Sequence, residues 1–378
     1  MIKRLAGRFI MAASMLLAAL PERAEAHDFR PLEALVNKAI SDSVFPGASL
    51  AILYKGEVVF HKGFGHFTYA ATSPPVETTT IYDLASLTKA VSTTSIAMQL
   101  VERDSLQLQA PVVHYLPDFK GAGKEKITIE QLMRHTSGLR AHTFYAKSCK
   151  SPQELFRAIE ADSLFSTPGT KTVYSDLNFM LLGRIIERMT GRTLAENFHH
   201  RFSAPLGMHT TLFTPPPSLV GRIAPVDRDS EWPLTTERPL VNDQNAALLG
   251  GVAGHAGLFS TTGDLMVMMQ MIMHQGSLNN HIYFRPATLR KFLARTSFPR
   301  ALGWDLRSLD GHSSAGNLFS AASYGHLGYT GTSIWVDPQK ELAVILLSNR
   351  VYPNPENIKI RTFRPLLHTT VVNCLGLQ

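Results

Sequence analysis

The chain has 378 residues and a formal net charge of +7, and 44% of its residues are hydrophobic, as in a globular protein with a sizeable core. Its Lys and Arg residues are scattered and form no basic stripe with interleaved aromatics, which argues against a nucleic-acid partner. Neither a Cys/His zinc spacing nor His-Glu-x-x-His occurs, so we predict no metal and no cofactor. The sequence leaves open whether its two cysteines, Cys149 and Cys374, form a disulfide.

Residues 1–26 have the pattern of an export signal. Segment 1–8 is basic, 9–20 is apolar, and Ala24-Glu25-Ala26 forms a small-x-small cleavage site. Because the apolar run is too short to span a bilayer, we predict no stable membrane anchor. We therefore expect a secreted or periplasmic protein that begins near His27 after cleavage close to Ala26.

The hydrophobic pattern of the remaining chain predicts strands near both ends and helices between them. A run of methionines in the last of the central helices indicates adaptable core filling and not a metal site. The pattern indicates an α+β fold of one domain, 27–378, in which 27–82 and 299–378 form the sheet part and 83–298 a mainly helical part. In chain order the predicted elements are a helix at 31–43, strands at 48–54 and 57–61 around a Lys55-Gly56 turn, helices at 86–103, 179–189 and 264–274, strands at 332–336 and 342–347 around a turn at 337–340, and a closing helix at 356–372.

Ser86-Leu87-Thr88-Lys89 is the first candidate for catalysis. A spacing of three on a helix places Ser86 and Lys89 on one face, where a serine nucleophile could meet a basic partner. Since a charged ammonium cannot accept a proton, we expect burial or a nearby positive charge to lower the pKa of Lys89. The motif alone is weak, because two surface residues on a helix would look the same.

Two later motifs could complete such a site. Pro168-Gly169-Thr170 precedes Tyr174-Ser175-Asp176-Leu177-Asn178, where the phenol could share proton transfer with Lys89. His326-Leu327-Gly328-Tyr329-Thr330-Gly331 precedes an apolar strand. Taken singly, each is more readily explained as structural.

Together, in this order, the motifs resemble the serine β-lactamase and penicillin-binding protein superfamily, in its class C-like branch. The resemblance covers nearly the whole chain after residue 26, and Gly250 to Phe259 resembles a narrower group related to the low-mass penicillin-binding protein 4B. It implies an antiparallel sheet flanked by terminal helices, with an inserted mostly helical domain. Further matching motifs are Phe45-Pro46-Gly47, His135-Thr136-Ser137-Gly138-Leu139 and Tyr352-Pro353-Asn354-Pro355.

The resemblance also implies residue roles. Ser86 would attack a carbonyl to form an acyl-enzyme while Lys89 and Tyr174 carry the proton. Backbone N–H groups of Ser86 and Tyr329 would form the oxyanion hole. His326 stands where the branch usually has a catalytic Lys. The substrate-binding positions implied are Asp176, Gly328 and Asn354.

Three positions depart from the family pattern. Asp176 replaces an Asn, and Asn178 cannot compensate because residues two apart do not share a helix face. His326 is largely neutral at pH 7 unless paired, so it would hold a carboxylate less firmly than Lys. Asn357 stands where class C β-lactamases carry an Arg. All three weaken the case for efficient β-lactam hydrolysis.

The function that these residues favour is hydrolysis of D-amino-acid peptides of the cell wall, as by a D-Ala-D-Ala carboxypeptidase acting on peptidoglycan peptides or another small molecule. An esterase or a β-lactamase would use the same residues. A non-catalytic penicillin-type sensor is a third reading, against which the intact Ser86, Lys89 and Tyr174 argue. The Gly-x-Ser-x-Gly motif of the α/β-hydrolases has only an imperfect match in this chain, at 311–315. His255 could face the cleft or be a buried structural residue.

Overall fold

A six-stranded antiparallel sheet forms the centre of the computed structural model, which describes residues 27–227 and 241–377. The predicted export signal lies outside these residues. The strand order is β2-β1-β11-β10-β9-β8, so strands from the two ends of the chain pair in the middle of the sheet. The strands are β1 (Gly47–Tyr54), β2 (Glu57–Gly65), β8 (Asp305–Leu306), β9 (Tyr324–Leu327), β10 (Ser333–Asp337) and β11 (Leu342–Ser348).

Two tight hairpins set the register of this sheet. Lys55 and Gly56, between β1 and β2, have φ values of 51° and 81°, as a two-residue turn between twisted strands requires. Between β10 and β11, the carboxylate of Asp337 accepts hydrogen bonds from the backbone N–H groups of Gln339 and Lys340 at 3.0 and 3.3 Å. Both turns confirm the predicted hairpins.

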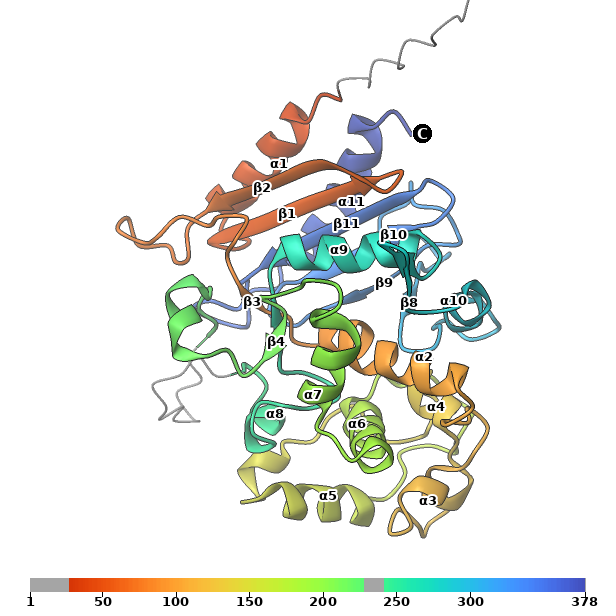
Figure 1. Cartoon of the computed structure of the whole chain (residues 1–378). Helices are drawn as coiled ribbons and strands as arrows, with labels where there is room; N and C mark the ends of the chain where they lie inside the picture. Colours follow the sequence, from red (N-terminus) through yellow and green to blue (C-terminus); the bar gives the residue numbers. More distant parts are fainter. Residues whose placement is uncertain (1–26, 228–240, 378) are drawn as a thin grey trace, which may run out of the picture.

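Helices cover both faces of the sheet (Figure 1). Alternate residues of a strand point to opposite faces, so Leu50 packs with α1 (Arg30–Ser41) and α11 (Ile360–Cys374), whereas Ala51 joins the core on the side of α9 (Thr262–Met273). Met266, Met268, Met269 and Met271 of α9 are buried there and Met273 is partly buried, which confirms the run as core residues. The predicted α+β class, with terminal helices flanking an antiparallel sheet, is confirmed.

The helices between β2 and β8 gather beside the sheet around a core that also includes residues of the central strands. Because that core is shared, the division of the chain into a sheet part and a helical part stays a prediction. These helices are α2 (Ser95–Glu102), α3 (Val112–Tyr115), α4 (Ile129–Met133), α5 (Pro152–Ala161), α6 (Asp176–Thr190), α7 (Leu194–Phe198), α8 (Gln244–Leu248) and α10 (Pro286–Leu293). The short strands are β3 (Tyr82–Asp83), β4 (Leu212–Phe213), β5 (Leu258–Ser260), β6 (Ser277–Leu278) and β7 (His281–Ile282).

The fold bears on two points from the sequence, the membrane anchor and the possible disulfide. Among the helices of residues 27–227 and 241–377, none has the length and apolar character needed to cross a membrane. Cys149 and Cys374 are both free thiols, so the pairing that the sequence left open does not form.

Candidate active site

Ser86 lies in a strained turn between β3 and the helix that leads into α2. Ala85, the residue before it, has a φ of 48°, a left-handed conformation that residues with side chains rarely adopt outside functional turns. The chain then winds as a π-helix over Lys89–Thr94 before it continues as α2. Lys89 Nζ donates a hydrogen bond of 2.8 Å to Ser86 Oγ, which confirms the predicted contact of the pair.

The ammonium group of Lys89 is fully buried and finds a partner for each of its three N–H groups. It donates to Ser86 Oγ, to the backbone carbonyl of His255 at 3.0 Å, and to Asp176 Oδ1 at 2.7 Å. Burial lowers the pKa of Lys89, but the charge of Asp176 outweighs it and holds that pKa above its ordinary value. The expectation of a lowered pKa is therefore wrong, because a carboxylate and not a second cation lies beside the amine.

Asp176 is the first residue of α6, where the helix dipole favours a negative charge. Its carboxylate bridges Lys89 and His142, whose Nδ1 lies 3.1 Å from Asp176 Oδ2. Burial raises the pKa of Asp176, yet Lys89 and the hydrogen bond of His142 overcome it and hold the pKa far below its usual range. The sequence predicted a substrate-binding residue here, but these contacts favour a role in setting the charge of Lys89.

Tyr174 packs above Lys89 within a ring of charged and aromatic groups. The Lys89 ammonium lies 5.0 Å from the centre of its ring, the Arg300 guanidinium 4.7 Å, and the His135 ring 4.6 Å. Burial raises the pKa of the Tyr174 phenol, although the charge of Lys89 and hydrogen bonds with Lys89 and Ser86 lower it. The phenol is thus neutral at rest and contacts both members of the Ser–Lys pair, as a shared role in proton transfer requires.

The motif around His135 holds Tyr174 in place. His135 Nδ1 accepts a hydrogen bond of 2.9 Å from the backbone N–H of Ser175, the residue next to Tyr174. Asn178 is buried and accepts a hydrogen bond of 2.6 Å from Ser137 Oγ. Asn178 therefore faces the core and does not replace the missing amide at the site, as the helical spacing indicated.

The two predicted oxyanion donors lie on segments that are tied together. Thr330 and Thr332 donate hydrogen bonds from their hydroxyls to the backbone carbonyls of residues 83–84, at 2.7 and 3.0 Å. These bonds fix the turn that carries Tyr329 against the turn that carries Ser86. Within the described part of the chain, the backbone N–H groups of Ser86 and Tyr329 donate to no protein acceptor. Both N–H groups are therefore available to a developing oxyanion.

Gly328 allows this close approach. A Cβ atom on Gly328 would lie 1.9 Å from Thr332 Oγ1 and 2.4 Å from the backbone carbonyl oxygen of Leu84, so any larger residue would push the two turns apart. The sequence predicts that Gly328 binds substrate. The close packing of the two turns also requires a glycine at this position.

His326 lies on β9 and is buried beside Tyr174, with their ring centres 6.0 Å apart. Its Nδ1 donates to the carbonyl of Leu327 at 2.9 Å, which makes Nε2 an acceptor, and Nε2 has no hydrogen-bond partner among residues 27–227 and 241–377. Burial, together with the positive charges of Arg300 and Lys89, lowers the pKa of His326 to about 4. His326 is thus neutral at pH 7, and the positive charge on this side of the site comes from Arg300.

His255, whose role the sequence left open, is buried and holds Lys89 through its backbone. Its Nε2 lies 3.0 Å from Asp243 Oδ1, and its carbonyl accepts the hydrogen bond from Lys89. A Cβ on Gly254 would lie 2.0 Å from the carbonyl oxygen of Phe179 in α6. The Gly-rich segment therefore serves close packing of His255 beneath the site.

A cavity of about 1010 Å³ opens above Ser86. Every predicted site residue except the buried Lys89 lines it, namely Ser86, Tyr174, Asp176, His326, Gly328, Tyr329 and Asn354. Asn354 stands at the exposed rim, where its side chain accepts a hydrogen bond from the N–H of Glu356. The sequence did not predict several charged or titratable residues of the cavity, among them His142, Asp243 and Arg300, which stand in no motif.

Known proteins resemble this chain in sequence and in fold. A Salmonella agona (strain SL483) protein named "Putative D-alanyl-D-alanine carboxypeptidase" is 31% identical over 355 residues, covering 84% of this chain and 82% of its own. A penicillin-binding protein homologue from Caulobacter crescentus has a TM-score of 0.75 at 21% identity, over 93% of this chain and 98% of its own. The hydrolase EstCE1 has a TM-score of 0.74 at 20% identity, over 90% and 97%.

The family model described as Beta-lactamase matches residues 32–368, which is most of the chain. The predicted resemblance to the β-lactamase and penicillin-binding protein superfamily is confirmed. The chain belongs to the Beta-lactamase family and is a serine hydrolase.

Proposed function

We propose that this enzyme is a D,D-peptidase, exported to the periplasm or the cell exterior, that hydrolyses D-amino-acid peptides of the cell wall through an acyl-enzyme on Ser86. The observation that carries the proposal is the contact of Ser86 Oγ with Lys89 Nζ at 2.8 Å, beneath a cavity that holds two unused backbone N–H donors. The carboxypeptidase name of the Salmonella agona relative supports the choice of substrate.

The charged Lys89 must lose a proton before it can act as a base. Asp176 opposes this loss, because its carboxylate lies 2.7 Å from the amine and raises the pKa of Lys89. The neutral amine is therefore the minor state at rest, and its share grows as the pH rises. Asp176 would thereby control the fraction of Lys89 that is neutral and able to act as a base.

Acylation then follows as neutral Lys89 takes the proton of Ser86, relayed by the Tyr174 hydroxyl that contacts both. As the Ser86 O–H bond breaks, its oxygen bonds to the substrate carbonyl carbon, and the N–H groups of Ser86 and Tyr329 hold the oxyanion. The same proton passes to the leaving D-amino acid when its C–N bond breaks. Water then cleaves the ester in a second, equivalent step that regenerates Ser86.

Arg300 is our candidate for binding the terminal carboxylate of a peptide substrate. It lines the cavity, stacks over Tyr174 and carries a permanent charge, whereas His326 is neutral at working pH. Part of its charge is balanced by Asp305, with which it forms a short ion pair.

The direct test is release of D-Ala from an acylated Lys-D-Ala-D-Ala peptide, measured beside the same peptide ending in L-Ala and a neutral nitrophenyl ester. Of the two peptides, we expect only the one that ends in D-Ala to be hydrolysed. Ser86→Ala should abolish this turnover, and Ser41→Ala, a control on the exposed end of α1, should keep it. Ester turnover without any release of D-Ala would overturn the peptidase proposal and leave an esterase.

A further inference from the structure

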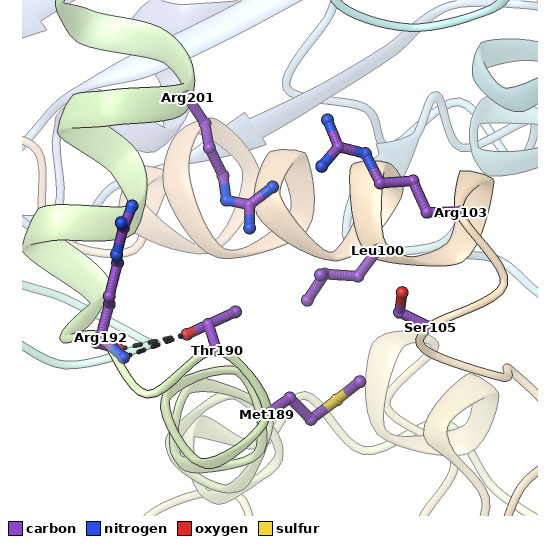
Figure 2. A pocket seen from close by; sticks show the side chains of 7 residues that line it. All are labelled: Leu100, Arg103, Ser105, Met189, Thr190, Arg192 and Arg201. Atoms are coloured by element: carbon purple, nitrogen blue, oxygen red, sulfur yellow. Dashed lines mark hydrogen bonds between the residues drawn. The ribbon is translucent and has the colours of Figure 1, made fainter.

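A second cavity, of about 310 Å³, lies where the ends of α2 and α6 meet the segment after α7 (Figure 2). We call it the arginine pocket. None of its lining residues also lines the cavity above Ser86. Arginine is the only charged residue type among them, and they are Leu100, Arg103, Ser105, Met189, Thr190, Arg192 and Arg201.

Neutral amides hold the central arginine in position. Arg201 donates from Nε to Asn197 Oδ1 and from Nη1 to Gln99 Oε1, both at 3.2 Å, and both amides are buried. The side chain of Asn197 also donates to the backbone carbonyl of Arg192 at 3.0 Å, so it fixes the neighbouring loop. Figure 2 shows Arg103 and Arg201 reaching toward each other from opposite sides. The pocket is thus built by buried polar contacts that do not neutralise its charge.

The three guanidinium groups repel one another without a counter-charge. In the described ranges 27–227 and 241–377, none of the three arginines forms a salt bridge. Burial lowers the pKa of Arg201, and the charges of Arg103 and Arg192 lower it further.

The ends of the neighbouring helices explain why this charge is tolerated. Arg103 caps the carboxyl end of α2 and Arg192 follows the cap of α6 at Gly191, where helix dipoles favour positive charge. Among the residues that the structure describes, neither the Arg103 nor the Arg192 side chain donates a hydrogen bond, so their N–H groups are available to an external acceptor.

We propose that the arginine pocket binds a phosphate group, free or esterified. Guanidinium groups recognise tetrahedral oxyanions through paired charge-assisted hydrogen bonds, and three arginines line this pocket. The hydroxyl of Ser105 adds a further donor, while Leu100 and Met189 offer an apolar wall to a small organic substituent. This function is separate from catalysis at Ser86.

The test compares wild type with Arg103→Gln and Arg201→Gln, and with Arg290→Gln as a control on the exposed face of α10. Calorimetric titration with inorganic phosphate and with glycerol phosphate is run at constant ionic strength against chloride. We expect saturable binding in wild type and in the control, weakened about tenfold or more by either pocket substitution. Tighter binding of glycerol phosphate would indicate an esterified group as the ligand, and tighter binding of inorganic phosphate the free ion.

If Arg201→Gln folds poorly, the stability of Arg103→Gln with and without phosphate tests the proposal instead. Within residues 27–227 and 241–377 the side chain of Arg103 forms no salt bridge and no hydrogen bond, so Arg103→Gln should still fold and should lose the extra stability that phosphate gives wild type. No saturable phosphate binding by wild type, or equal binding by all four proteins, would overturn the proposal.

Discussion

Replacing Asp176 by Asn tests how the charge of the base is controlled, because it removes one charge and keeps the shape. The two charges lie 2.7 Å apart and attract by about 6 kcal/mol at an effective dielectric constant of about 20. Desolvation of both groups offsets part of this, and removing one partner of a buried pair costs about 3–5 kcal/mol. Lys89 can lose its proton in this variant, and the Asn oxygen still accepts a hydrogen bond. We therefore expect Asp176→Asn to lower the free energy of unfolding by an amount near the lower end of this range, about 3 kcal/mol at pH 7.

The pH dependence follows from the same contact. Asp176 raises the pKa of Lys89, so without its charge the neutral amine forms at lower pH. The rising limb of kcat/KM against pH should therefore move to lower pH in Asp176→Asn. The folded-state pKa of Asp176 is depressed, so its contribution to stability is fully present above its unfolded pKa of about 4 and decreases progressively as the pH falls from there toward the much lower folded-state pKa.

Rate profiles from pH 5 to 10 and urea unfolding at pH 7 and pH 3 measure both effects. The matched control is Asp42→Asn, which breaks an exposed ion pair of 2.9 Å with Lys38 and should change little. A rising limb that stays in place or moves to higher pH would contradict this, as would an unfolding difference that is as large at pH 3 as at pH 7.

Three further predictions concern neighbouring residues of the site. Lys89→Ala and Tyr174→Phe should each reduce acylation by orders of magnitude and the double change little more, because groups that act as a unit are non-additive; additive losses in stopped-flow acylation would make Tyr174 a packing residue. Asp243→Asn should lower kcat with KM nearly unchanged, because it loosens the segment through which the His255 carbonyl holds Lys89, and a change in KM alone would count against this. Since the pKa of His326 is about 4, peptide hydrolysis between pH 6 and 8 should show no limb from His326, and wild type and His326→Gln should give profiles of the same shape there.

Local spacing was enough to predict the parts of the site that one helix or one turn builds. Ser86 and Lys89 meet because they are three residues apart, and Asn178 faces the core because it is two residues from Asp176. Runs of apolar and β-forming residues on either side of turn residues likewise predicted the two hairpins of the sheet. These features depend on neighbours in the chain, which a sequence displays directly.

Long-range contacts could not be predicted in this way. The charge of Lys89 is set by Asp176, which reaches it across the fold, and Asp176 is itself held by His142. Arg300 and Asp243 enter the cavity from separate loops as isolated residues without a motif. Their roles follow only from distances, and so the sequence predicted the nucleophile but not the electrostatics around it.

The central claim is that Ser86 forms the acyl-enzyme, and intact-protein mass spectrometry after incubation with benzylpenicillin tests it most directly. We expect one adduct of the mass of the drug, mapped by peptide sequencing to Ser86, absent in Ser86→Ala and kept in Ser41→Ala. The adduct should decay slowly, because Asp176, His326 and Asn357 differ from the residues that suit efficient β-lactam hydrolysis in the family. An adduct on another residue, or one that survives Ser86→Ala, would contradict the account.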